Sequence, residues 1–256
     1  MTDLATPSPT SAPTRGADRP ERILAVGAHP DDIDFVAGGT LALWVSQGAA
    51  VTYCVITDGD AGGHDRSVAR ESVAGLRRRE QREAAAAIGV TDVVFLGYQD
   101  GALAVSPELR RDLARVIRRV RPEVIICQSP ERNWWGRVQA NHPDHLAAGE
   151  ATLCAVYPDA RNPFAFPELM ADGLEPYHVG AVWLAHSAHP DRAVDVTGSV
   201  EGKVEALARH VSQMDRGVEG MRRSVYKDAA RAAQRFGLGE GKLAEAFQVV
   251  VTEEVE

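Results

Sequence analysis

The chain has 256 residues, of which 45% are hydrophobic, a length that allows one sizeable α/β core rather than two full domains. Its 36 acidic and 28 basic residues give a net charge of −8, which argues against nucleic acid as a partner because phosphate backbones need clustered cations. The three cysteines, Cys54, Cys127 and Cys154, show no CxxC spacing, so we expect free thiols in a reducing, cytoplasmic compartment.

The first 20 residues are rich in Pro, Ser and Thr and lack the apolar stretch of a signal peptide. Such a segment buries too little apolar surface to offset the entropy lost on ordering, so we expect a flexible tail over residues 1–20. The remainder, residues 21–256, is expected to form one domain. No later stretch approaches the length of a membrane span, so we expect no membrane as a partner.

Short β-branched runs alternate with longer segments of helical period from Ile23 onward. We expect strands at 23–27, 51–57, 92–96, 123–127 and 181–186, and helices at 35–47, 67–88, 107–121 and 143–156. Two further helices are expected at 200–214 and 221–236, and whether the final run from Phe247 pairs as an edge strand is left open. This alternation is typical of a Rossmann-like α/β fold, a single domain with a mostly parallel sheet and helices on both faces.

Four polar loops follow the first four predicted strands. They read GAHPDDID from Gly27, TDGDAGGHD from Thr57, GYQDGAL from Gly97 and QSPERNWWGRVQANHPDH from Gln128. In an open parallel sheet the functional crevice lies beyond the carboxyl ends of the strands, because the loops there are free to carry polar groups. We therefore expect the four loops to meet at one edge of the sheet.

The first of these loops brings His29, Asp31 and Asp32 together directly behind an apolar strand. Pro30 fixes its φ angle and stiffens the turn, so the three side chains must share a small space. Neighbouring carboxylates repel each other, and a divalent cation removes that cost. Helix capping by Asp32 or Asp34 is the simpler explanation for either acid alone, but it does not account for His29.

A second motif, NHPDH, places His142 and His145 three residues apart at the expected start of a helix. Residues at this spacing lie on the same face and can address one point. A lone histidine here is more often a surface or capping residue, but two of them at the edge that also carries HPDD favour a metal site. Two imidazoles and one carboxylate are the three protein ligands of a catalytic zinc site, which keeps its fourth position for water.

The paired motifs, AHPDD after the first strand and HPDH farther along the chain, resemble the LmbE-like or PIG-L family of zinc-dependent N-deacetylases. The likeness extends from about Ile23 to His210 and includes TDGDAGG, the helix with Arg77 and Glu80, LGYQDGAL and HVSQ. It implies an amidohydrolase that removes an N-acyl group, expected to be acetyl, from an amino sugar or sugar conjugate. The zinc ligands that it implies are His29, Asp32 and His145.

The resemblance also implies a role for five other side chains. Asp31 would be the general base, and protonated His142 would stabilise the oxyanion. Asp144 would orient and charge His142. Arg77 and Asp100 fall where the family contacts sugar hydroxyls; the alternatives are a charge on the helix surface for Arg77 and a turn-forming role for Asp100.

Two positions depart from the family pattern. Ile33 stands where a glutamate usually follows the paired acids, with Asp34 next, and that glutamate is not a metal ligand. Ala140 stands where some members carry a tyrosine, so any role of that tyrosine in gating or acid catalysis must be absent or filled by another group.

Two other functions compete with zinc-dependent hydrolysis. A non-haem iron oxygenase is one, because H-x-D and a further histidine can form a facial triad, although such enzymes typically use an all-β barrel. A non-catalytic module that binds a small ligand on a Rossmann-like sheet is the other. The substrate, the native metal and the oligomeric state stay open at this level.

Overall fold

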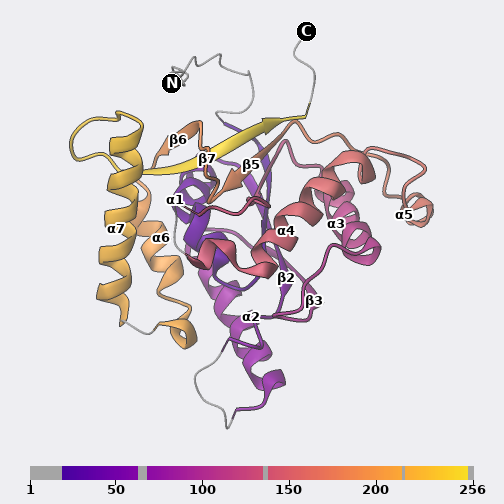
Figure 1. Cartoon of the computed structure of the whole chain (residues 1–256), viewed down its shortest axis with the longest axis horizontal. Helices are drawn as coiled ribbons and strands as arrows, with labels where there is room; N and C mark the ends of the chain where they lie inside the picture. Colours follow the sequence, from indigo (N-terminus) through magenta and orange to yellow (C-terminus); the bar gives the residue numbers. More distant parts are fainter. Residues whose placement is uncertain (1–18, 63–67, 135–137, 215–216, 253–256) are drawn as a thin grey trace, which may run out of the picture.

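The computed structural model describes residues 19–62, 68–134, 138–214 and 217–252. These ranges leave out residues 1–18 of the expected tail. They also leave out Ser67, the expected first residue of the second helix. The described chain forms one α/β domain around a seven-stranded sheet in the order β3-β2-β1-β4-β5-β7-β6 (Figure 1). Among the described helices, none combines the length and apolar character that crossing a bilayer requires.

Five strands of the sheet run parallel. They are β1 (Arg22–Gly27), β2 (Ala50–Thr57), β3 (Asp92–Tyr98), β4 (Val124–Gln128) and β5 (Ala181–Ala185). The segments between the first four strands and after β4 are α1 (Asp32–Ser46), α2 (Arg70–Ala87), α3 (Pro107–Val120), η1 (Val138–Asn141) and α4 (Pro143–Cys154). Every strand and helix expected in this half is present, and the predicted fold class is confirmed.

The second half departs from the alternation. It contains η2 (Ala155–Asp159), α5 (Pro167–Ala171), β6 (Arg192–Asp195), α6 (Val200–Leu207), η3 (Val211–Gln213), α7 (Gly217–Arg235) and β7 (Ala244–Val251). Strand β7 runs antiparallel between β5 and β6, so the final apolar run is an inner strand and β6 is the edge. Four residues are too few to display a strand period, which is why β6 was not predicted.

The helix expected over 200–214 ends early, at Leu207. The chain then turns, and the imidazole of His210 reaches a buried carboxylate of α1, Asp34. The expected end of this helix was therefore wrong because a contact with a distant segment outweighs local helix propensity.

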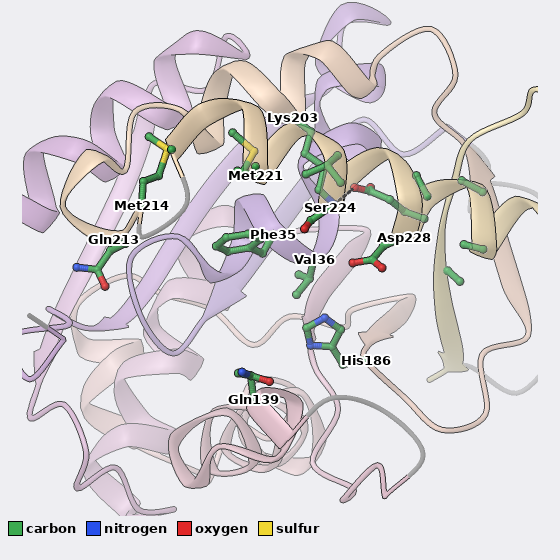
Figure 2. Close-up of a pocket in the computed structure, with 18 residues that line it drawn as sticks. Phe35, Val36, Gln139, His186, Lys203, Gln213, Met214, Met221, Ser224 and Asp228 are labelled. Atoms are coloured by element: carbon green, nitrogen blue, oxygen red, sulfur yellow. Dashed lines mark hydrogen bonds and ion pairs between the residues drawn. The ribbon is translucent and has the colours of Figure 1, made fainter. Parts of the chain in front are cut away.

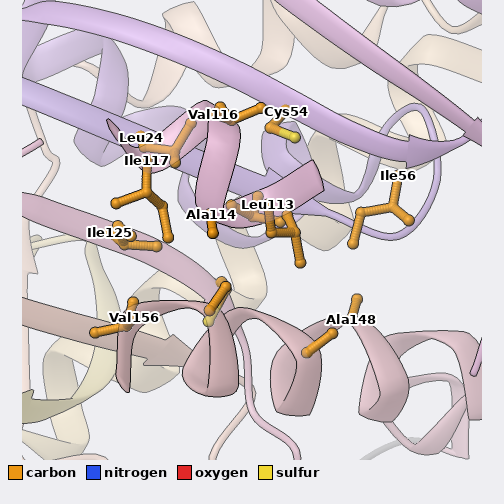
Figure 3. Packing of buried hydrophobic residues seen from close by; sticks show 14 of the residues in the cluster. Leu24, Cys54, Ile56, Leu113, Ala114, Val116, Ile117, Ile125, Ala148 and Val156 are labelled. Carbon is orange, nitrogen blue, oxygen red and sulfur yellow. The ribbon is translucent and has the colours of Figure 1, made fainter. Parts of the chain in front are cut away.

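Helices cover both faces of the sheet. On one face α3 and α4 pack against Leu24 and Ile125 of the strands (Figure 3). On the other face α1, α2 and α6 pack against Ile23 and Trp183. Adjacent strand residues such as Ile23 and Leu24 alternate between the two clusters because successive side chains of a strand point to opposite faces. With both faces buried, the polar loops are confined to the ends of the strands.

Candidate active site

The loop after β1 and the start of α4 meet at the carboxyl edge of the sheet, as expected for parallel strands. Asp32 lies between two imidazoles there: its Oδ2 is 3.2 Å from His29 Nδ1, and its Oδ1 is 3.1 Å from His145 Nε2. The three residues that the sequence suggested as metal ligands are thus brought together from two distant loops.

His142 joins this group from the N-cap of α4. One ring nitrogen from each of His29, His142 and His145 lies within 4.8 Å of the others. His142 Nδ1 accepts a hydrogen bond of 3.2 Å from the backbone N–H of Asp144, so the neutral ring carries its proton on Nε2. Burial and the charges of His29 and His145 lower the pKa of His142, and the charges of Asp144 and Asp100 oppose this fall.

The second ring nitrogen of His29, Nε2, is held by two more carboxylates. Asp100 Oδ1 lies 3.1 Å from it and Asp144 Oδ2 lies 3.2 Å from it. Burial lowers the pKa of His29, but hydrogen bonds to Asp100, Asp144 and Asp32 outweigh this effect and raise it to about 12. A carboxylate on one imidazole nitrogen orients the other toward a metal, a common arrangement around metal-binding histidines.

The contacts of the Asp144 carboxylate include a partner, His29, that the sequence did not indicate. This carboxylate is fully buried and accepts hydrogen bonds from His29 and from the backbone N–H of Gly101, the latter at 2.7 Å. Its backbone N–H, not its carboxylate, meets His142. Asp144 therefore orients His29, because the turn at Gly101 fixes the carboxylate on that side.

Asp31 adjoins this centre with a φ of 97°, a left-handed conformation that is uncommon for a residue with a side chain. Its N–H donates to Gln81 Oε1 at 2.8 Å, and its Oδ2 lies 3.3 Å from Arg77 Nη2. Arg77 and Gln81 are one turn apart on α2, so one helix face holds both the backbone and the carboxylate of Asp31. Burial raises the pKa of Asp31 to about 6, although the charge of Arg77 opposes this rise.

Arg77 is only 4% exposed, which excludes the alternative of a charge on the helix surface. Its guanidinium donates to the carbonyls of Pro30 at 2.5 Å and Gly59 at 2.8 Å. A Cβ atom would lie 2.2 Å from Arg77 Nη1 if built on Gly59 and 2.6 Å from it if built on Gly62. Gly59 and Gly62 of TDGDAGG thus make room for Arg77, which ties the loops after β1 and β2 together.

A buried polar support lies behind Asp31. Gln81 Nε2 donates to Asp34 Oδ2 at 2.8 Å, and His210 Nε2 lies 2.9 Å from the same oxygen. The Tyr53 hydroxyl donates to Asp34 Oδ1 at 3.1 Å. The segment HVSQ, which carries His210, was the signal for this support in the sequence, whereas nothing in the sequence singled out Gln81.

With this geometry in place, the comparisons with known proteins are decisive. Residues 24–156, about half of the chain, match the PIG-L family, described as GlcNAc-PI de-N-acetylase. The chain belongs to the PIG-L family. It is 31% identical over 193 residues to a diacetylchitobiose deacetylase from Thermococcus kodakarensis, covering 75% of this chain and 70% of the relative.

Two further relatives support membership in the PIG-L family. A Bacillus cereus protein named "Probable N-acetyl-alpha-D-glucosaminyl L-malate deacetylase 2" is 30% identical, and the match covers 81% of this chain and 91% of the relative. The solved structure of N,N′-diacetylchitobiose deacetylase from Pyrococcus horikoshii has a TM-score of 0.83 and 27% identity, covering 93% of this chain and 86% of that one. This member of the PIG-L family is accordingly a deacetylase, a hydrolase of amide bonds.

The residues at the centre of this PIG-L site fit a divalent metal. Two or three imidazoles and the Asp32 carboxylate are the nitrogen and oxygen donors that zinc takes in catalytic sites. Asp32, Asp100 and Asp144 all contact His29. A divalent cation would balance these carboxylates in place of the proton that His29 carries in the metal-free protein.

Proposed function

We propose that this PIG-L protein is a zinc-dependent amidohydrolase that removes an acetyl group from the nitrogen of an amino sugar or sugar conjugate. The observation that carries the proposal is Asp32, which lies between His29 and His145 while Asp31 is fixed beside it. In this assignment His29, Asp32 and His145 hold the metal. Zinc in such a site lowers the pKa of a water and polarises the amide carbonyl.

Asp31 is the general base of the proposed reaction. Its pKa of about 6 leaves it ionised at neutral pH yet basic enough to accept a proton from the attacking water. Gln81 and Arg77 hold the backbone and the carboxylate in place, so the acceptor oxygen needs no reorganisation. The same carboxyl group then returns the proton to the leaving nitrogen, which gives free amine and acetate from amide and water.

His142 is the donor that we assign to the carbonyl oxygen as this oxygen gains negative charge. Its Nδ1 is tied to the backbone of Asp144, so the proton on Nε2 is available for the oxyanion. The Asp144 carboxylate is a positioning group that acts through His29.

The substrate class rests on the relatives. Diacetylchitobiose and the N-acetylglucosaminyl malate conjugate in their names both carry N-acetylglucosamine. Arg77 and Asp100 border the metal residues, and the proposal gives them contacts with the sugar hydroxyls in addition to their contacts within the protein. A cytoplasmic location is part of the same proposal, supported by the unpaired thiols of Cys54, Cys127 and Cys154.

The test begins with protein stripped by a chelator. It should release neither amine nor acetate from N-acetylglucosaminides, regain activity with about one equivalent of zinc, and consume no oxygen. His145→Ala should lose both zinc and activity, whereas the matched variant of an exposed histidine, His189→Ala, should keep both. Oxygen uptake with iron would favour the oxygenase instead, and a zinc-loaded protein that releases no amine from any N-acyl amino sugar would reject the proposal.

A further inference from the structure

The segment HVSQ, residues 210–213, follows α6 and contacts buried carboxylates of two helices that border the candidate active site. His210 Nε2 lies 2.9 Å from Asp34 Oδ2 on α1. The N–H and the hydroxyl of Ser212 donate to the two carboxylate oxygens of Glu80 on α2, at 2.8 and 2.6 Å. This short segment of the second half of the chain therefore joins α1 to α2.

The last residue of the segment, Gln213, contacts the loop after β2. Its amide donates to the carbonyl of Gly62 and to the hydroxyl of Ser212, each at 3.1 Å. In Figure 2 this side chain stands at one end of a groove of about 520 Å³ between α1 and α7, and it points away from Phe35 in the middle of the groove. The amide of Gln213 is thus used for contacts within the protein and not for a ligand in the groove.

The contact of His210 reaches the backbone of Asp31 through two side chains. Asp34 is fully buried, and its Oδ2 accepts hydrogen bonds from His210 and from Gln81 Nε2. Because a side-chain amide carries its donor and its acceptor on opposite arms, this contact leaves Gln81 Oε1 to accept from the Asp31 N–H at 2.8 Å. His210 Nδ1 has no hydrogen-bond partner within the described ranges, so Asp34 is the polar group that this imidazole supports.

The other contacts of the segment reach the carboxylate of Asp31. Arg77 Nη2 lies 3.3 Å from Asp31 Oδ2, and Gly62 packs against the same guanidinium, since a Cβ there would lie 2.6 Å from Nη1. Gln213 holds Gly62 on this guanidinium. Glu80, the partner of the segment on α2, is 6% exposed and lies three residues after Arg77. The segment thus fixes the surroundings of both groups that hold Asp31.

Asp31 needs such support because of its backbone conformation. Its φ of 97° is strained for a residue with a side chain and persists only where the surroundings fix it. Its direct partners, Arg77 and Gln81, both lie on α2, so a shift of α2 against the loop after β1 would weaken both contacts at once. Residues 210–213 contact α1, α2 and the loop after β2 together and oppose this shift.

We propose that residues 210–213 act as a clamp that positions Asp31 for proton transfer, with His210 acting through Asp34 and Gln81. The proposal rests on the proposed deacetylase function and names a positioning element for its general base. The clamp keeps the acceptor oxygen of Asp31 in place and leaves the binding of zinc and substrate to other residues.

The test compares variants of the clamp on an N-acetylglucosaminide. His210→Leu should lower kcat about fivefold, the ratio that one hydrogen bond gives, with KM and zinc content unchanged. His210→Gln keeps an N–H donor and should stay within about twofold of the wild type. Gln213→Met, at a less buried position, should lose about as much as His210→Leu. Val211→Ala, at a side chain 69% exposed between them, is the matched control and should equal the wild type.

The same substitutions in an Asp31→Asn background separate positioning from a general loss of structure. The clamp acts on the reaction only through the Asp31 carboxylate, so His210→Leu should leave the residual kcat of Asp31→Asn unchanged. A further loss of about fivefold in that background would overturn the proposal, because the effect would then be independent of Asp31.

Hydrogen exchange gives a readout that needs no turnover. The Asp31 amide of the zinc-loaded protein, followed by NMR, should exchange about fivefold faster in His210→Leu and at the wild-type rate in His210→Gln. The Leu174 amide, held by the Leu169 carbonyl at 2.9 Å beside α5, should not change (Figure 1).

The exchange rates also distinguish the two proposals. Unchanged exchange at Asp31 in His210→Leu would overturn the clamp and leave the deacetylase proposal standing. Faster exchange at Asp31, in a protein that releases no amine from any N-acyl amino sugar, would support the hold of the clamp on Asp31 and reject the proposed reaction.

Discussion

Two buried arginines hold two different regions of this protein. Arg77 on α2 is 4% exposed and ties together the loops after β1 and β2, whereas Arg118 on α3 is 2% exposed. The guanidinium of Arg118 donates to the carbonyls of Asp159, Ala160, Asn162, Ala165 and Leu174. It thereby fixes the irregular segment between α4 and β5.

The difference between them lies in their partners and not in their burial. These five carbonyl acceptors of Arg118 belong to the backbone of one segment, so this side chain determines the shape of that segment. Arg77 also contacts a carboxylate, Asp31, next to the residues proposed to hold the metal. A buried charge indicates function when its partner is another ionisable group that a reaction can use, and burial alone is not sufficient.

The largest effect on activity is expected from removing the carboxylate of Asp31, the ionisable partner that Arg77 has in addition to its backbone carbonyls. Asp31→Asn should lower kcat by about 10²–10⁴-fold, the usual contribution of a general base, and should bind zinc as the wild type does. The control is the neighbouring acid: Asp32→Asn should lose zinc, measured by atomic absorption. If Asp31→Asn loses the metal and Asp32→Asn keeps it, the two acids have been assigned in reverse.

Removing the guanidinium of Arg118, the buried arginine on α3, should affect stability. Arg118→Met leaves several buried carbonyls unpaired and should lower the free energy of unfolding by about 3–5 kcal/mol, seen as a fall in Tm of roughly 6–20 °C. The kcat of the folded variant should match the wild type. The control is Arg115, which lies on α3 like Arg118 and forms an exposed ion pair with Asp172. Arg115→Met breaks this pair and should lower the free energy of unfolding by less than about 1 kcal/mol. A loss of kcat in folded Arg118→Met would contradict the comparison.

Keeping the charge of Arg77 while removing its planar fork gives a smaller effect. Arg77→Lys cannot reach Pro30, Gly59 and Asp31 at once, so kcat should fall by roughly 10–100-fold, the equivalent of one charge-assisted hydrogen bond. Arg78→Lys, which changes the neighbouring pair with Asp58, serves as the control and should stay within about threefold of the wild type. Equal losses in both variants would show that α2, and not Arg77, is the sensitive element.

The smallest effect is expected at Gln81, the partner of the Asp31 backbone. Gln81→Met keeps the length of the side chain but removes the neutral hydrogen bond that supports the left-handed φ of Asp31, and also the hydrogen bond that Gln81 donates to the buried carboxylate of Asp34. The loss at Asp34 should lower stability, whereas the loss at Asp31 acts on the reaction. We expect kcat to fall by about fivefold, the equivalent of one neutral hydrogen bond, with KM and zinc content unchanged. Gln47→Met, at an exposed glutamine after α1, should leave kcat unchanged. A change in KM alone would assign Gln81 to substrate binding instead.

The sequence predicted the parallel half of the fold and the groups at its edge. Hydrophobic periodicity is local, so β1 to β4 and the helices between them could be located without knowledge of their neighbours. HPDD and NHPDH follow two of these strands, and the rule that such loops meet at the carboxyl edge predicted that the two motifs lie together. The choice of His29, Asp32 and His145 within them came from the resemblance to the PIG-L family.

Only the tertiary structure decided which side chains contact one another at the carboxyl edge of the sheet. It also decided how the strands of the second half are ordered. The Asp144 carboxylate faces His29 instead of His142, and Gln81 supports Asp31, because α2 and the turn at Gly101 pack against the loop after β1. The order of β5, β7 and β6 likewise depends on pairing between segments far apart in the chain. Local periodicity records which residues are buried, but a contact between distant segments is set by how the elements pack, and no short stretch of sequence contains that information.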